Sequence, residues 1–120
     1  MIKSLLLVGL GSFFGGVIRY YISTLMKSLC NPGFPWGTLL VNLAGCLIIG
    51  IILGKCGSQS SAWSLLLATG FCGGFTTFSA FANESVQMLQ NGNIFHFVAY
   101  ISASVIVGVA LVALGYWLVK

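Results

Sequence analysis

Charged side chains are scarce in this sequence, and their scarcity excludes most classes of protein. Lysine, arginine, aspartate and glutamate make up 5% of the 120 residues, whereas a soluble domain carries about 25%. Hydrophobic residues make up 58%. A water-soluble globule is therefore excluded, and we expect the chain to be embedded in a membrane.

The few chemically active side chains are also too scattered for three common kinds of site. The five basic residues stand singly, which argues against nucleic acid as a partner. The cysteines form no C-x-x-C pair, so we expect free thiols at Cys30, Cys46, Cys56 and Cys72. The only histidine, His96, has no cysteine or carboxylate at helical ligand spacing. We therefore do not expect an enzyme.

Long apolar runs fill the sequence between the charges. An apolar helix of ~20 residues crosses a hydrocarbon core of about 30 Å. Four such runs are separated by turn residues, at about residues 4–25, 37–54, 63–90 and 95–118. The predicted fold is an all-α integral membrane protein, with one four-helix transmembrane domain over residues 1–120. We expect it to be a multi-pass protein of the cell (inner) membrane.

The basic residues give the chain little preference for either orientation. Four crossings place Lys3, Lys55 and Lys120 on one side of the membrane, against Arg19 and Lys27 on the other. Because lysine and arginine set orientation, this distribution allows insertion both ways. An antiparallel, dual-topology homodimer within the lipid bilayer is therefore a hypothesis.

Small residues recur at the spacing that lets membrane helices pack closely. The pairs are Gly11/Gly15, Gly50/Gly54, Gly70/Gly74 and Ser104/Gly108. Such spacing predicts close helix contacts and carries little information about function.

Four polar side chains fall at similar depth, toward one face of the membrane: Arg19, Asn42, Glu84 and Tyr100. A polar group in hydrocarbon usually faces a cavity or a partner. A basic residue with amide and hydroxyl donors behind it suits an anion better than a cation. Arg19 could equally extend toward the lipid headgroups or pair with Glu84.

The segment from Gly70 to Phe81 is the most informative part of the chain. Three glycines followed by two threonines make a poor helix, and helical rise places them near the bilayer midplane. We expect the third helix to break there, which would free carbonyl groups that can coordinate a cation. In an antiparallel pair, both breaks could share one ion on the two-fold axis. The alternative is a hinge or packing patch without an ion.

Two side-chain patterns near the break could line a path for an anion. Phe78 and Phe81 share a helix face, and the positive edges of aromatic rings can replace part of an anion's hydration shell. Tyr100, Ser104 and Gly108 form a second stripe at i, i+4, i+8. A phenylalanine pair is more often core or lipid-facing, and a helical serine often bonds its own i−4 carbonyl.

With these residues in place, the sequence resembles the Fluc, or CrcB, family of fluoride channels. The matching elements cover the first three spans, and the fourth matches mainly through Tyr100 and Ser104. They are Gly15-Gly16 with Arg19-Tyr20, Gly37-Thr38-Leu39-Leu40-Val41-Asn42 with Gly45, and Gly70 to Phe81 with Glu84. The chain departs from relatives at Gly108, where some have a polar residue, and at Ala80, where threonine is common.

The resemblance implies a dual-topology, antiparallel homodimer with two pores. Such a channel exports fluoride passively from the cytoplasm and relieves fluoride toxicity. The resemblance also implies a structural sodium ion at the dimer centre, held by the backbone carbonyls of Gly73 and Thr76 from each chain. Arg19 would lie near an aqueous vestibule, and the anion pathway would use Asn42, Phe78, Ser79, Phe81, Tyr100 and Ser104.

Two other functions fit a chain of this size. A small dual-topology four-helix cation or multidrug transporter would need a carboxylate within the membrane for proton exchange, and the only acid, Glu84, lies near a membrane face. In a non-transporting membrane assembly subunit, Asn42 and the glycine-rich break would serve packing alone.

Overall fold

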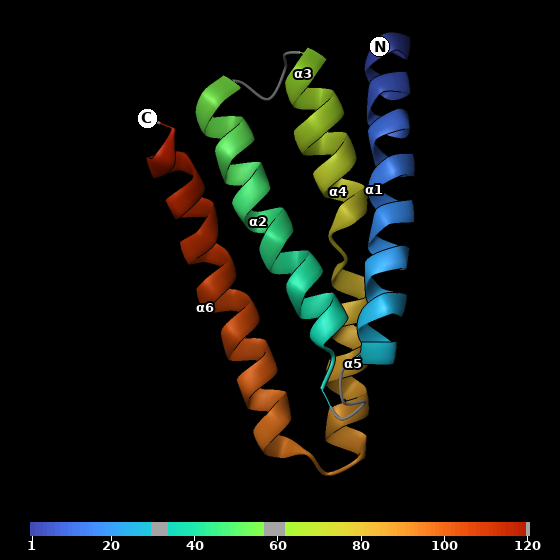
Figure 1. Ribbon diagram of the computed structural model, residues 1–120, viewed down its shortest axis with the longest axis vertical. Helices are drawn as coiled ribbons and strands as arrows, with labels where there is room; N and C mark the ends of the chain where they lie inside the picture. The colour runs from blue at the N-terminus through green and yellow to red at the C-terminus, as the bar shows by residue number, and fades with distance from the viewer. Residues whose placement is uncertain (30–33, 57–61, 120) are drawn as a thin grey trace.

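The computed structural model describes residues 1–29, 34–56 and 62–119, and these residues form helices joined by short connections. Three spans are continuous helices: α1 (Ile2–Leu29), α2 (Trp36–Cys56) and α6 (Ile94–Leu118) (Figure 1). The third span is assembled from α3 (Ala62–Ser64), η1 (Leu65–Cys72), α4 (Gly73–Phe75) and α5 (Phe78–Gln90). Residues 30–33 and 57–61, which lie in the loops predicted on either side of the second span, are outside the described residues.

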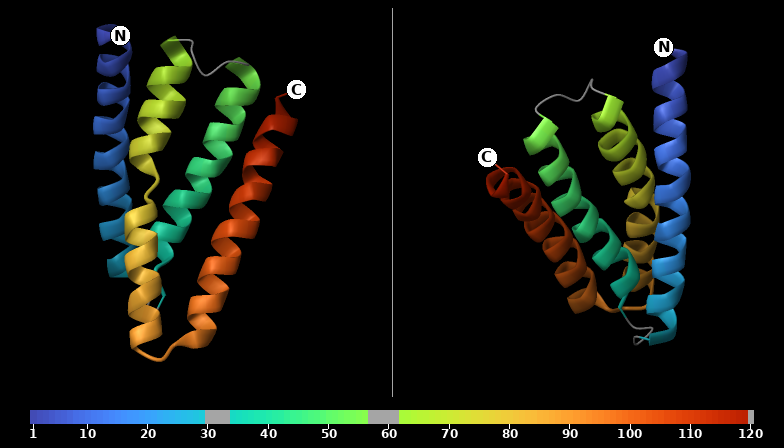
Figure 2. Two further views of the ribbon diagram at one scale, coloured as in Figure 1. Left: turned by 180° about the vertical axis from the view of Figure 1, so that it is seen from behind. Right: turned by 45° about the horizontal axis from the view of Figure 1, so that its top comes forward.

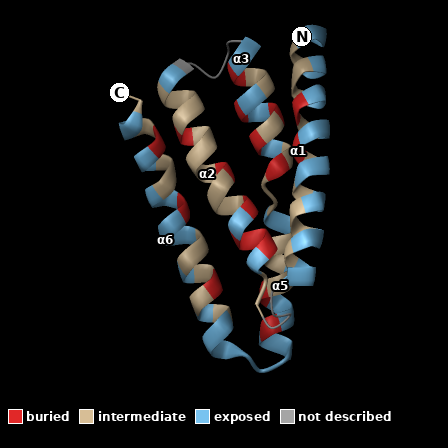
Figure 3. Ribbon diagram, viewed as in Figure 1, coloured by how far each residue is buried: buried red, intermediate tan, exposed pale blue. Residues whose placement is uncertain are grey.

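Each of the four helical segments is long and apolar enough to cross a membrane. Their mean hydropathies are 1.6, 2.2, 1.5 and 2.5 in chain order. Large apolar side chains such as Leu6, Phe14 and Val109 are exposed on the outside of the bundle, where lipid can cover them. The buried residues are few and lie mainly where helices face one another (Figure 3). The chain is therefore an all-helical, multi-pass membrane protein, as its composition predicts.

Glycines bring α1 against the third span, and both views in Figure 2 show the two side by side. A Cβ atom at Gly11 would overlap the carbonyl oxygen of Leu66, and one at Gly15 would overlap that of Phe71. From the opposite side, a Cβ at Gly74 would meet the backbone of Ser12. The predicted close contact at these glycines is confirmed, because the backbones approach too closely for any side chain.

A second glycine contact joins α2 to α6. A Cβ at Gly50 would overlap the carbonyl oxygen of Val112. On α6, a Cβ at Gly115 would lie 2.7 Å from both the Ile51 nitrogen and the Leu47 oxygen. The spacing rule predicted a contact at Gly50, and the structure adds Gly115 as its counterpart.

The third span departs from α-helical geometry twice. Residues Leu65–Cys72 form a π-helix, which is wider than an α-helix. After one α-helical turn at Gly73–Phe75, Thr76 (φ −85°, ψ 157°) and Thr77 (φ −148°, ψ 120°) are extended. Helix α5 then begins at Phe78, and the Thr77 hydroxyl accepts the backbone N–H of Ala80 at 3.2 Å. The extended residues are thus the threonines, while the glycines before them are helical.

Candidate functional site

Asn42 on α2 binds the extended segment through both ends of its side-chain amide. Its Nδ2 donates to the Thr77 carbonyl oxygen at 3.1 Å, and the Thr77 backbone N–H donates to its Oδ1 at 2.8 Å. These bonds replace helical hydrogen bonds that an extended backbone cannot make. Asn42 therefore fixes the position of Thr77 relative to α2.

The extended segment also interrupts the helical hydrogen bonds of the carbonyl groups around it, among them those of Gly73 and Thr76. In a continuous helix the Gly73 carbonyl would accept the Thr77 N–H, which instead donates to Asn42. The Thr76 carbonyl would accept the Ala80 N–H, which instead donates to the Thr77 hydroxyl. Gly73 and Thr76 are the two residues whose carbonyls the family resemblance assigns to sodium.

Arg19 lies beside the same segment. Its Nε donates to the Gly74 carbonyl oxygen at 3.3 Å, which in a continuous helix would accept the Phe78 N–H. The alternative that Arg19 pairs with Glu84 is not what the structure shows, because Glu84 is held by two hydroxyl groups instead.

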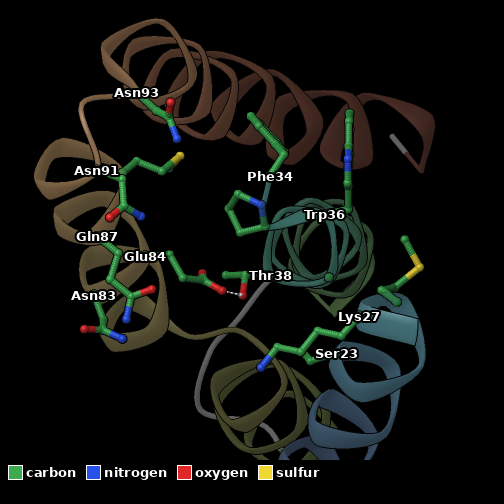
Figure 4. Close-up of a pocket in the computed structure, with 14 residues that line it drawn as sticks. Ser23, Lys27, Phe34, Trp36, Thr38, Asn83, Glu84, Gln87, Asn91 and Asn93 are labelled. Atoms are coloured by element: carbon green, nitrogen blue, oxygen red, sulfur yellow. Dashed lines mark hydrogen bonds between the residues drawn. The ribbon is translucent and has the colours of Figure 1, made fainter. Parts of the chain in front are cut away.

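Glu84 on α5 accepts one hydrogen bond at each carboxylate oxygen. Thr38 on α2 donates to Oε2 at 3.0 Å, and Tyr100 on α6 donates to Oε1 at 3.1 Å. Thr38 is 5% exposed and Tyr100 is fully buried. The carboxylate thereby ties three helices together at the edge of a cavity of about 460 Å³ (Figure 4).

An aromatic row runs from the outer surface to Tyr100. Phe78 is 78% exposed, and its ring centroid lies 5.8 Å from that of Phe81, at 47° between planes. Phe81 in turn lies 5.0 Å from Tyr100, at 46°. Tilted rings at these distances present edges as well as faces to their surroundings. The row connects the extended segment with the Glu84 carboxylate.

A second cavity, of about 520 Å³, lies beside the extended segment and gathers most of the predicted residues. Its lining includes Asn42, Gly73, Thr76, Phe78, Phe81 and Ser104. The Ser104 Oγ atom is buried and has no hydrogen-bond partner among the described residues. Tyr100 joins this group through Phe81. Arg19 contacts the backbone at Gly74, and Ser79 lies within 3.3 Å of the Thr77 hydroxyl in an exposed position.

Several participants in the site were not singled out by sequence reasoning. Thr38 stands one helical turn before Asn42, a spacing that could have suggested a shared face. The pairing of Thr77 with Asn42 has no comparable signal in the sequence.

Cys46 and Cys72 line the second cavity as free thiols, as expected. Cys30 lies outside the described residues, and the same holds for the Cys56 side chain. Among the described residues, no three His, Cys, Asp or Glu side chains cluster as a metal site.

Comparison with known proteins assigns the chain to a family. A sequence model described as "CrcB-like protein, Camphor Resistance (CrcB)" matches residues 6–116. A relative from Leptospira interrogans is 40% identical over 98% of this chain and 95% of its own. One from Phocaeicola vulgatus is 43% identical over 97% and 98%, and one from Chlorobium phaeobacteroides is 44% identical over 98% and 93%. All three are named fluoride-specific ion channel FluC. The chain therefore belongs to the CrcB-like family, whose relatives named here are fluoride-specific ion channels.

Proposed function

We propose that this protein is a fluoride-selective passive channel that exports fluoride from the cytoplasm and relieves fluoride toxicity. The identity of the transported ion comes from the relatives, which are named fluoride-specific ion channels. The observation that carries the proposal is the row of ring edges and hydroxyls from Phe78 to Tyr100. A small, strongly hydrated anion needs several such donors in place of its water.

The proposed pathway follows this row. The anion enters past Arg19 and the Asn42 amide, crosses the edges of Phe78 and Phe81, and reaches the Tyr100 hydroxyl. Ser104, whose buried Oγ atom has no hydrogen-bond partner among the described residues, can donate to the anion midway. Ser79 faces the outer end of the path beside Thr77.

Neither rival function is favoured by the geometry. A proton-coupled cation transporter needs a membrane carboxylate surrounded by further acceptor groups for its cationic substrate, whereas Glu84 is bonded by the hydroxyl donors of Thr38 and Tyr100. In a non-transporting subunit, a buried serine without a partner would be an uncompensated defect.

Reconstituted vesicles provide the test. Vesicles that contain only this chain and are loaded with fluoride are expected to release it rapidly, and chloride-loaded vesicles are expected to release little. A fluoride-selective electrode and a chloride electrode measure the two rates. Equal rates for both ions, or no release of either, would contradict the proposal.

We further propose that the working unit is an antiparallel homodimer with two pores. The nearly balanced basic residues support this arrangement because they allow both orientations. A Cβ at Gly73 would have no atom within 4 Å, so this part of the third span is uncovered in one chain. A second copy would cover it.

A structural sodium ion at the centre of that dimer is the third part of the proposal. The carbonyls of Gly73 and Thr76 lack their usual helical donors, and unwound carbonyls of this kind coordinate sodium in membrane proteins. Two carbonyls from each chain would supply four oxygens, and the ion would satisfy groups that are costly to leave unpaired in hydrocarbon.

Gly73→Val tests the dimer and the ion together. The variant is expected to fold as a protomer, because its side chain meets open space within one chain, yet to lose dimer and fluoride flux. Gly9→Val is the matched control, since a Cβ there also meets nothing within 4 Å. Cross-linking in membranes and flux measurements report the outcome. A dimeric, active Gly73→Val protein would contradict the proposed interface.

Replacing sodium in the buffer with a bulky organic cation tests the ion separately and is expected to weaken the wild-type dimer.

A further inference from the structure

Two hydroxyl donors at the inner end of the aromatic row are already occupied. Thr38 and Tyr100 both donate to the Glu84 carboxylate, at 3.0 and 3.1 Å. Each hydroxyl has one proton to donate. While these protons are given to Glu84, they are not available to an anion that arrives from Phe81.

The carboxylate has an alternative environment beside it. Glu84 lines the cavity of about 460 Å³, which also contains the side-chain amides of Asn83, Gln87, Asn91 and Asn93. Lys27 is the only basic residue in the described lining, and its side chain extends along the cavity (Figure 4). Amide N–H groups and an ammonium group can hold a carboxylate that leaves the hydroxyls.

We propose that Glu84 competes with the permeating anion for the Thr38 and Tyr100 hydroxyls, and that Lys27 and the cavity amides receive its carboxylate when an anion displaces it. This proposal rests on the fluoride-channel function given above. The Glu84 carboxylate occupies the two hydroxyl donors whenever no fluoride is bound to them. Carboxylate oxygens and fluoride are both negatively charged acceptors, so the same donors suit both in turn.

The exchange avoids two unfavourable states. If the hydroxyls had no resident acceptor, they would be buried and unpaired whenever the path is empty. If the carboxylate stayed in place beside an arriving fluoride, two negative charges would meet in a medium of low dielectric constant and repel. Movement of the carboxylate toward Lys27 relieves the repulsion.

Glu84→Gln measures the competition directly, through fluoride efflux recorded at a series of fluoride concentrations. In the wild-type protein, the conformation with the Glu84 carboxylate away from the hydroxyls is the minor state. A minor state populated at about 10% lowers the apparent affinity about tenfold, so the half-saturating concentration is expected to fall by about that factor in Glu84→Gln. An unchanged half-saturating concentration, with wild-type fluoride transport intact, would overturn the proposal and leave the channel function standing. Absence of transport by the wild-type protein would instead contradict the channel function itself.

A double variant separates competition from the general charge of the cavity. Glu84→Gln combined with Gln87→Glu keeps one carboxylate in the cavity lining. The carboxylate then stands at position 87 instead of position 84, away from the Thr38 and Tyr100 hydroxyls. The half-saturating concentration is expected to stay as low as in Glu84→Gln alone. A return to the wild-type value would show that charge at the cavity is sufficient, and would overturn the proposal.

Lys27→Gln tests where the carboxylate goes. In the wild-type background the change is expected to raise the half-saturating fluoride concentration, since the displaced carboxylate loses its counter-ion. In the Glu84→Gln background it should have no such effect. An equal effect in both backgrounds would make Lys27 a general attractor of anions and remove it from the exchange.

If Glu84→Gln fails to give a monodisperse protein, Glu84→Asp takes its place. This variant withdraws the carboxylate by one methylene and is also expected to lower the half-saturating fluoride concentration.

Discussion

Asn42→Leu is expected to abolish fluoride transport while the four helices remain in the membrane. The change removes both hydrogen bonds to Thr77, and each buried backbone group left unpaired costs about 1–3 kcal/mol. Hydrocarbon offers no water to replace the lost partner. The extended segment would therefore shift away from α2, and Phe78, which follows directly, would move with it. Fluoride efflux from vesicles measures the loss.

Two further variants sharpen this prediction. Asn42→Asp keeps an acceptor for the Thr77 N–H but places a second oxygen against the Thr77 carbonyl, so it is expected to fail as well. Ser102→Leu, which makes the same kind of polar-to-apolar change at an exposed position of α6, should transport fluoride normally. Normal flux through Asn42→Leu would show that the amide neither holds the segment nor lines the path.

The spans and their glycine contacts could be predicted because each depends on local sequence alone. An apolar run of sufficient length is a membrane helix whatever its neighbours are. Glycines four residues apart lie on one face, so Gly11 and Gly15 had to present a smooth surface to some partner. The identity of that partner, η1 with α4, was not available from the pattern.

The backbone of the third span shows a finer limit of sequence reasoning. Glycine and threonine both disfavour a helix, and the pattern does not say which of them leaves it. In the structure Gly73 and Gly74 stay helical, and Gly74 serves contact with α1. Thr76 and Thr77 are extended, and Asn42, from another helix, bonds both backbone groups of Thr77.

The polar contacts of the site depend on the arrangement of three or four helices. Depth estimates placed Arg19, Asn42, Glu84 and Tyr100 toward one membrane face, but depth does not determine direction around a helix. Arg19 and Glu84 could have paired by that criterion. In the structure they serve different partners, the Gly74 carbonyl and the hydroxyls of Thr38 and Tyr100.

Gly45→Ala is expected to reduce fluoride flux by about tenfold or more. A Cβ at Gly45 would overlap the Cγ2 methyl of Thr76 and lie 3.5 Å from the Phe75 ring. Thr76 cannot simply rotate, because its hydroxyl donates to the Cys72 carbonyl oxygen at 2.8 Å. Overpacking of this kind costs about 1–3 kcal/mol, and about 1.4 kcal/mol corresponds to a tenfold change. Efflux per mole of reconstituted protein is the measurement.

Thr76→Ser supplies the compensating change. It removes the methyl group that the new side chain would strike but keeps the hydroxyl for Cys72. The nearest remaining atom of residue 76 would be its Cβ, at 3.7 Å from the alanine Cβ, which is an ordinary contact. The double variant Gly45→Ala/Thr76→Ser is therefore expected to recover most of the flux, and Thr76→Ser alone should lose little. A double variant as inactive as Gly45→Ala would show that the loss of flux comes from other packing contacts of α2 and not from the Thr76 methyl group. Recovery would identify the fixed position of Thr76, held between Gly45 and Cys72, as the requirement for conduction.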